Sequence, residues 1–309
     1  MKAHRMFPRT TISALALICG IFLALTPTPA AADRPNVLIL LADDVDQRDF
    51  GCYGNDAIRT PHIDSLAKQG LLFENAFLTT SSCSPTRISV LTGKYPHATG
   101  AEDLHMPLPA NQKFVSTYLQ QQGYFTGHML KTHYGKQGDA QFQWYSSNVK
   151  EFPKFLDQAG DKPFFMWVGF RQAHRGYQPG AVDPPHDPQT VKVPPYLVDT
   201  PETRADLGLY YDEISLMDEH IGGMVAELKR RQQFDNTLIV FFGDNGRPFP
   251  RAKGTCYDSG IGTPLVMSWP AAIAADQRTD ALSSVIDLAP TVMEVAGLKP
   301  AADMQGRSL

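Results

Sequence analysis

Residues 36–44 decide the fold, and they read Asn36-Val37-Leu38-Ile39-Leu40-Leu41-Ala42-Asp43-Asp44. Six consecutive apolar residues, 37–42, are typical of a strand that is buried on both faces of a parallel sheet. Comparable apolar runs recur at 125–130, 164–170, 237–243 and 264–268. Helical patterns alternate with them, at 63–69, 115–122, within 205–231 and at 288–295. The alternation predicts an α/β fold with a mostly parallel central sheet and helices on both faces.

Polar side chains follow the first four of these strands. In strand order they are Asp43 and Asp44, Lys131 and His133, His174, and Asp244 and Asn245. The carboxyl ends of the strands in such a sheet meet along one edge, which is where ligands bind. Because carboxylates, cations and imidazoles are all represented, we expect one common site there.

The acidic members of this set suit a divalent cation. Asp43, Asp44 and Asp244 supply hard carboxylate oxygens and Asn245 an amide oxygen, which calcium or magnesium prefers and zinc does not. The alternative is that the Asp-Asp and Asp-Asn-Gly sequences only cap helices and form turns. Convergence of the carboxylates would favour a metal, since their mutual repulsion is otherwise costly.

A second feature is the run Cys83-Ser84-Pro85-Thr86-Arg87, directly before an apparent helix at 88–91. The start of a helix attracts anions, and proline is tolerated in the first turn. The guanidinium fork of Arg87 suits a charged tetrahedral oxyanion better than a neutral substrate. The run therefore indicates a nucleophile beside an anion site. The alternative is a small buried thiol in a loop.

This run, followed by Leu91-Thr92-Gly93-Lys94, resembles the signature Cys-x-Pro-Ser-Arg of the sulfatase family, with Thr86 in place of the commoner serine. The resemblance extends from residue 34 to the end of the chain. It implies the fold of the alkaline phosphatase superfamily, and it implies that a formylglycine-generating enzyme oxidises Cys83 to the aldehyde formylglycine. It further implies that calcium binds Asp43, Asp44, Asp244, Asn245 and residue 83.

Other family motifs match in the same order along the chain. Lys131-Thr132-His133 is similar to Gly-Lys-Trp-His-Leu-Gly, with Leu130 for glycine and Thr132 for tryptophan. His174 matches the substrate-side histidine and Lys253 the second lysine of the family. The implied roles are neutralisation of sulfate by Arg87, Lys131 and Lys253, handling of the formylglycine diol proton by His133, and protonation of the leaving oxygen or nitrogen by His174. Taken singly, each His or Lys would be read as a surface residue.

The substrate that the resemblance implies is a sulfated carbohydrate. Residues 244–250, Asp-Asn-Gly-Arg-Pro-Phe-Pro, are similar to the heparan N-sulfatase (sulfamidase) branch, and an O-sulfate or an N-sulfate both remain open. One alternative is a formylglycine-dependent phosphonate monoester or phosphodiester hydrolase of the same superfamily. Another is a non-catalytic carbohydrate-binding remnant, because residues 305–309 resemble the point where sulfatases continue into a smaller C-terminal subdomain. We therefore expect a catalytic domain truncated at its C-terminus.

The N-terminus predicts export. Lys2, Arg5 and Arg9 precede an apolar run within 12–25 that is too short for a comfortable membrane span, and small residues end at position 32. We expect a signal peptide over 1–32, a sulfatase domain over 33–309, a secreted or periplasmic protein, and no membrane association after cleavage.

Net charge and cysteine content also bear on the ligands and the disulfides that we expect. Of 28 basic and 32 acidic residues, cleavage removes three basic ones and leaves a formal charge of minus seven. Nucleic-acid binding is not expected, since no polybasic cluster is present to displace counterions. Cys52 and Cys256 would either form a disulfide or pack as separate thiols. A proline- and aspartate-rich segment, 179–201, is predicted to be a surface excursion that borders the substrate cleft.

Overall fold

Strand β1 (Asn36–Ala42) lies in the middle of the sheet, and all seven of its residues are buried. The structure is a computed structural model that describes residue 1 and residues 34–309. Apart from its first residue, the predicted signal peptide lies outside the described residues and stays a prediction. β1 pairs in parallel with β6 on one side and β7 on the other, which is the arrangement that its continuous apolar run predicts.

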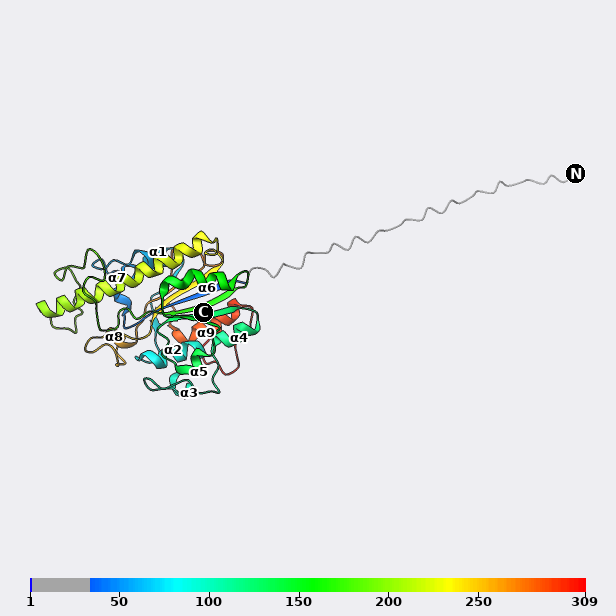
Figure 1. Cartoon of the computed structure of the whole chain (residues 1–309), viewed down its shortest axis with the longest axis horizontal. Coiled ribbons are helices and arrows are strands. Elements are labelled where there is room, and N and C mark those ends of the chain that lie inside the picture. The colour runs from blue at the N-terminus through cyan, green and yellow to red at the C-terminus, as the bar shows by residue number, and fades with distance from the viewer. Residues whose placement is uncertain (2–33) are drawn as a thin grey trace. The chain divides into compact units, whose positions relative to one another are not determined.

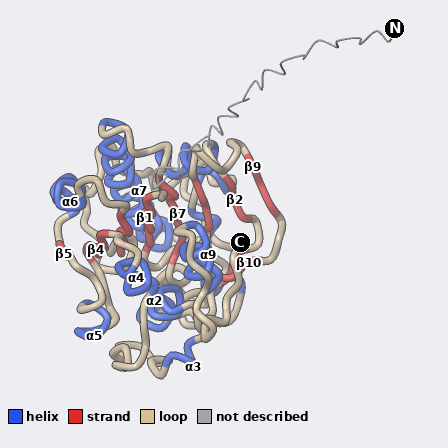
Figure 2. The backbone as a smooth tube through the Cα atoms, turned by 90° about the vertical axis from the view of Figure 1, so that its right-hand side faces the viewer, coloured by secondary structure: helices blue, strands red, loops and turns tan. Residues whose placement is uncertain are grey.

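Within the described residues, the main sheet has eight strands in the order β5-β4-β6-β1-β7-β8-β2-β9, and β10 and β3 form a separate two-stranded sheet. Figure 2 shows the strands running across the molecule from β5 to β9. The remaining strands are β2 (Leu71–Phe73), β3 (Ala76–Phe77), β4 (Phe125–Leu130), β5 (Trp144–Ser146), β6 (Phe164–Gly169), β7 (Thr237–Gly243), β8 (Leu265–Ser268), β9 (Gln277–Thr279) and β10 (Ser283–Ser284).

The helices lie before, between and after these strands. They are α1 (Pro61–Lys68), α2 (Cys83–Thr92), α3 (Pro96–Thr99), α4 (Val115–Gln121), α5 (Gly135–Asp139), α6 (Phe152–Ala159), α7 (Pro201–Arg230), α8 (Asp258–Ile261) and α9 (Leu288–Val295). Short 3₁₀ helices occur at Gln47–Asp49, Gly51–Tyr53, Val149–Glu151 and Val285–Asp287. None of the helices within residues 34–309 has the length and hydrophobicity needed to span a bilayer.

Two hydrophobic cores separate on the two faces of the sheet. Alternate residues of β1 point to opposite faces, so Leu38 and Leu40 join one core and Val37 and Ile39 join the other. The first core includes residues of α1, α6 and α7, and the second includes residues of α2, α4 and α9. Figure 1 shows these two sets of helices on opposite sides of the strands. The predicted fold class, a mostly parallel sheet covered on both faces, is therefore confirmed.

The structure differs from the sequence expectations in several details. β8 was expected as one more strand of a mostly parallel sheet, but it runs antiparallel to both β7 and β2. The connection from β7 to β8, residues 244–264, is long enough for a crossover, but its only α-helix is the four-residue α8. No long helix carries the chain back across the sheet, so the chain returns antiparallel to β7. Helix α6 and the three-residue strands β2, β5 and β9 were not predicted. Pro153 lies in the first turn of α6, a position that proline tolerates.

The structure also bears on the segment 179–201 and on the cysteines. Residues 179–200 contain no helix or strand, as predicted, but Val182, His186 and Val191 are buried rather than exposed. His186 Nδ1 lies 2.7 Å from Asp212 Oδ1 of α7, which ties the segment to that helix. Cys52 and Cys256 are both free, so they form no disulfide in this structure. Cys52 is half-buried, but Cys256 is exposed and not packed as the alternative predicts.

Candidate active site

The ends of β1 and β7 bring their acidic residues together. Asp43 and Asp44 follow β1, and Asp244 and Asn245 follow the adjacent strand β7. Backbone pairing between these two segments continues past the strands. Asp244 N donates to Ala42 O, and Val45 N donates to Asn245 O, at 3.0 Å each. Residues 200 positions apart in sequence are thereby held next to each other.

Helix α2 delivers the cysteine to the same place. Cys83 is its first residue, and all ten residues of the helix are buried. The ligand atoms of Asp43, Asp44, Cys83 and Asp244 all lie within 4.8 Å of one another. Cys83 Sγ is 3.5 Å from Asp43 Oδ1 and 4.0 Å from Asp44 Oδ1. The convergence expected from the strand ends and the cysteine run is therefore present.

The hydrogen bonds of the Asn245 side chain indicate whether the cluster can hold a cation. Its Nδ2 donates to Asp44 Oδ1 at 2.6 Å and to Gly246 O at 3.0 Å. Its Oδ1 is buried and has no hydrogen-bond partner within the described part of the chain. A buried amide oxygen without a partner is costly. A hard divalent cation beside the carboxylates would satisfy that oxygen, so the donor set fits calcium or magnesium.

Three buried or half-buried cations surround the cluster. Arg87 Nε donates to Asp244 Oδ2 at 2.9 Å, and Lys131 Nζ forms an ion pair with Asp43 Oδ2. Lys253 Nζ lies 2.5 Å from Asp44 Oδ1 and 3.3 Å from Cys83 Sγ. Three carboxylates thus face three cations, and the cluster is electrically balanced before any ion or substrate enters.

The environment of Cys83 disfavours a reactive thiolate. Burial, together with the charges of Asp244 and Asp43, raises the pKa of its thiol to about 12. The thiolate is the nucleophilic form of cysteine, so the unmodified thiol is a weak nucleophile near neutral pH. Burial and the repulsion of Asp43 likewise raise the pKa of Asp244.

His133 is held neutral beside these cations. Burial is the largest cause, followed by Lys131 and Arg87, and the pKa of His133 is lowered to about 3. Its Nδ1 is buried without a hydrogen-bond partner among the described residues. Its ring lies against that of His105, with centroids 4.6 Å apart. A neutral imidazole with a free nitrogen can accept or pass a proton.

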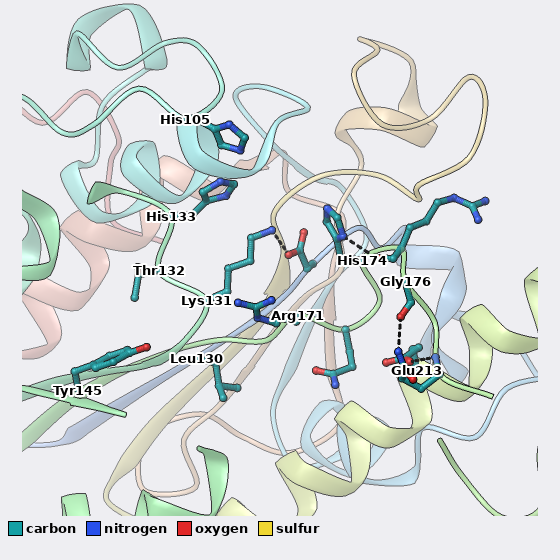
Figure 3. A pocket seen from close by; sticks show the side chains of 14 residues that line it. His105, Leu130, Lys131, Thr132, His133, Tyr145, Arg171, His174, Gly176 and Glu213 are labelled. Atoms are coloured by element: carbon teal, nitrogen blue, oxygen red, sulfur yellow. Dashed lines mark hydrogen bonds and ion pairs between the residues drawn. The ribbon is translucent and has the colours of Figure 1, made fainter. Parts of the chain in front are cut away.

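A cavity of about 660 Å³ opens above the cluster (Figure 3). Asp43, Lys131, His133 and His174 line it, so the cavity connects the buried carboxylates with solvent. The remaining predicted site residues are absent from the lining of this cavity. They belong to the acidic cluster beneath it or contact a member of that cluster. His174 is exposed, and its Nδ1 lies 3.0 Å from the carbonyl oxygen of Arg175. Within the described residues, the lining includes Gln178 and Glu213 but nothing from 179–201, so the prediction that this segment borders the cleft is wrong for this cavity.

Several lining residues were not predicted from the sequence. His105, Tyr145, Arg171, Arg175 and Glu213 all face the cavity. Arg171 and Arg175 flank His174 in the stretch 170–175, Phe-Arg-Gln-Ala-His-Arg, so the repeated cations were a usable signal. Nothing in the sequence around 105 or 213 marks those residues, because they reach the cavity only through the tertiary fold.

The two arginines that flank His174 differ in their contacts. Arg175 forms a bidentate pair with Asp206, at 3.1 and 2.7 Å, and its guanidinium lies 4.7 Å from the centre of the Phe249 ring. Arg171 is exposed and has no ion pair or hydrogen bond from its side chain among residues 34–309. Arg175 is therefore structural, whereas Arg171 is available to an anionic ligand.

A layer of buried side chains packs beneath the acidic cluster. Arg247 Nε donates to Asp49 Oδ1 at 2.7 Å, and both side chains are buried. The Tyr210 hydroxyl from α7 lies 2.5 Å from Asp49 Oδ2 and 3.0 Å from the Asp44 carbonyl oxygen. Arg247, which was noted only as part of the 244–250 motif, fixes the backbone around Asp44 through these contacts.

Comparisons with known proteins bear on the family of this chain. The sulfatase family model matches residues 35–298. The chain is 34% identical to human N-sulphoglucosamine sulphohydrolase over 84% of this chain and 61% of that protein. It is 27% identical to an ulvan-active sulfatase of Formosa agariphila, over 89% of this chain and 54% of that protein. The chain thus spans somewhat more than half the length of these curated relatives.

A solved structure shows the same fold. The crystal structure of Ps i-CgsB in complex with k-i-k-neocarrahexaose superimposes with a TM-score of 0.76 at 26% sequence identity. The superposition covers 88% of this chain and 74% of that chain. The family model matches most of the chain, and one relative is 34% identical over 84% of this chain. The chain belongs to the sulfatase family.

Proposed function

We propose that this protein hydrolyses the sulfate ester or sulfamate bond of a sulfated carbohydrate. The observation that carries the proposal is the convergence of Asp43, Asp44, Cys83 and Asp244 within 4.8 Å at the base of a cavity that also holds Lys131 and His174. Membership of the sulfatase family and similarity to carbohydrate-active sulfatases support it.

The charge balance of the site supports an anionic substrate. Three carboxylates and three cations cancel, so a bound divalent cation would leave the site positive by two charges. Such a site attracts the sulfuryl group and stabilises charge that develops on its oxygens. The excess would be largely buried, where electrostatic interactions are stronger than in water.

Two groups that the family implies fit the residues present. A divalent cation, calcium or alternatively magnesium, would be held by Asp43, Asp44, Asp244, Asn245 and residue 83, and it would supply Lewis acidity. Formylglycine derived from Cys83 would supply a hydrated aldehyde as the nucleophile.

The side chains of this chain then divide the remaining tasks. Lys131 and Lys253 would hold and neutralise the sulfuryl oxygens, and Arg87 would fix Asp244 while adding positive charge beneath them. His133, neutral and with a free buried nitrogen, would take up the proton of the nucleophile. His174, exposed on the cavity wall, would protonate the leaving oxygen or nitrogen.

The proposal has two versions, which differ in whether the cleaved bond is a sulfamate or a sulfate ester. Similarity to human N-sulphoglucosamine sulphohydrolase supports a sulfamate on glucosamine, and similarity to the ulvan-active sulfatase supports a sulfated polysaccharide. We further propose export to the periplasm or the medium after removal of residues 1–32, and maturation by a formylglycine-generating enzyme.

The test combines one mass measurement with one assay. The protein is co-expressed with a formylglycine-generating enzyme, and the peptide that contains Cys83 is analysed by mass spectrometry. Conversion makes that peptide about 18 Da lighter. Sulfate release from glucosamine N-sulfate, glucosamine 6-O-sulfate and 4-nitrophenyl sulfate is then measured beside hydrolysis of a matched 4-nitrophenyl phosphonate.

We expect sulfate release by the converted protein and its loss, by about a thousand-fold or more, in Cys83→Ala. A preference for the phosphonate would assign the protein to the alternative hydrolase class. A converted and folded protein that cleaves none of the substrates would favour the non-catalytic carbohydrate-binding alternative and overturn the proposal.

A further inference from the structure

We infer that a second cavity, next to the candidate active site, binds the sugar residue adjacent to the one that carries the scissile sulfate. The inference rests on the proposed function and extends it from a single sulfated sugar to an oligosaccharide. It further assigns the adjacent residue a chemical character: a neutral sugar that presents hydroxyl groups, not a second sulfate.

The two cavities are neighbours that share part of their walls. The second cavity has a volume of about 490 Å³, within the size range of small-molecule sites. Thr132 and Tyr145 line both cavities. Thr132 lies between Lys131 and His133 in the chain, so a ligand bound over those two residues can extend across Thr132 into the second cavity.

Aromatic side chains form a fixed surface in this cavity. Tyr145 is 54% exposed, and its ring centroid lies 4.8 Å from that of the buried His128. His128 packs on Phe142 at 4.7 Å with nearly parallel rings, and its Nδ1 lies 2.9 Å from the Tyr134 hydroxyl. The Tyr145 ring is therefore supported from behind while much of it faces solvent. A rigid, exposed ring that is apolar with a polar tip suits the C–H face of a sugar.

Charge distinguishes the two cavities. The lining of the first contains Lys131, Arg171 and Arg175 together with Asp43 and Glu213. Arg175 is paired with Asp206, so Arg171 is the residue of this lining that is available to an anion. The lining of the second contains Asp139 but no lysine or arginine among the described residues. An anionic substituent placed there would meet a carboxylate without a compensating cation. Hydroxyl groups, in contrast, can donate to Asp139 and exchange hydrogen bonds with the side chain of Gln143.

The experiment compares three substrates that differ only beyond the cleaved residue. They are glucosamine N-sulfate, its disaccharide with N-acetylglucosamine at the reducing end, and the disaccharide in which both glucosamines are N-sulfated. If the enzyme cleaves only O-sulfates, the corresponding 6-O-sulfated series is used. The quantity measured is kcat/KM for each disaccharide divided by kcat/KM for the monosaccharide.

We expect the wild type to favour the neutral disaccharide over the monosaccharide about tenfold or more. Tyr145→Ala should lower that ratio about tenfold, and Tyr145→Phe, which keeps the ring, should retain it. Asp139→Asn should raise the ratio for the disulfated disaccharide selectively. Tyr95→Ala, at another exposed tyrosine that lines neither cavity, is the matched control and should behave as the wild type.

A binding measurement separates failure of the inference from failure of the proposed function. In saturation-transfer NMR with the neutral disaccharide, the ring protons of the N-acetylglucosamine should receive magnetisation from the wild type and from Tyr145→Phe, but not from Tyr145→Ala. Equal ratios in the wild type and Tyr145→Ala, with sulfate still released, would overturn the inference alone. Absence of sulfate release with the NMR contact intact would overturn the proposed function alone.

Discussion

Arg87 Nη2 lies 2.8 Å from Asp244 Oδ2, and neither side chain is exposed to solvent. The same guanidinium donates from Nε to that oxygen and from Nη1 to the carbonyl oxygen of Lys131, at 2.8 Å. One side chain of α2 thus joins the segments that follow β7 and β4. The position of Asp244 in the candidate metal cluster depends on this contact.

Removing the guanidinium should destabilise the protein strongly. Arg87→Ala leaves the buried Asp244 carboxylate without its main counter-charge, and breaking a buried pair in this way costs about 3–5 kcal/mol. The free energy of unfolding in urea measures the loss. Lys68→Ala, which breaks the exposed pair Lys68–Asp276, is the control and should change that energy by less than about 0.5 kcal/mol. Equal effects of the two substitutions would contradict the role given to Arg87.

Gly169 provides the space that Arg87 needs. A Cβ atom at this position would collide with the Lys131 carbonyl oxygen and with Arg87 Nη1. Gly169→Ala should therefore shift both groups and destabilise the fold by about 1–3 kcal/mol, with a parallel loss of activity. Gly223→Ala in α7 is the matched control, because nothing lies near its Cβ and alanine favours a helix by about 0.5–1 kcal/mol. Unchanged stability of Gly169→Ala would show that an alanine Cβ fits beside Arg87 and the Lys131 carbonyl, and would contradict the role given to Gly169.

Calcium should stabilise the folded protein. A ligand that binds only the folded state adds about 2.7 kcal/mol to the free energy of unfolding at a hundred times its Kd. The measurement is thermal and urea unfolding with calcium, with magnesium and with a chelator. Asn245→Ala removes the buried oxygen that lacks a partner and should weaken the calcium effect. Stabilisation of equal size in this variant would place the ion elsewhere.

His128 should make stability depend on pH. Burial lowers the pKa of His128 to about 4, against 6.5 in the unfolded chain. Between these values the unfolded state binds more protons than the folded state, so stability is complete above pH 6.5 and is lost as the pH falls toward 4. The loss amounts to about 3 kcal/mol.

Urea unfolding at several pH values checks this expectation in the wild type and in His128→Gln. The variant should lose that part of the acid sensitivity between pH 6.5 and 4. His97→Gln, at a histidine with no contact to His128, is the control and should keep the profile of the wild type. An unchanged profile in His128→Gln would assign the acid sensitivity to other groups.

Much of the fold followed from the sequence, because its strands are buried on both faces. Such strands consist of continuous apolar residues, as in 37–42, and three of the four predicted helices are followed by a glycine, at positions 70, 123 and 297. The direction of β8 did not follow from the sequence, since an apolar run has the same composition in either direction. Short edge strands such as β5 and β9 carry too few residues to show a period.

The site was predictable where the chemistry lies next to a regular element. Asp43 and Asp244 directly follow strands, and Cys83 begins a helix, so their convergence followed from the topology. His105 and Glu213 reach the same cavity from a loop and from the middle of α7. Their sequence neighbourhoods carry no sign of it, because tertiary packing alone brings them there.

The burial of α2 sets an order of events in biosynthesis. Cys83 is 2% exposed, and all ten residues of the helix that it begins are buried. Ile88, Val90 and Leu91 of this helix belong to the second core. An enzyme that binds several residues around the sulfur could not reach them while these residues are buried. We therefore expect that a protein that oxidises this cysteine acts before the chain has folded, and that a molecule that folds first keeps the thiol.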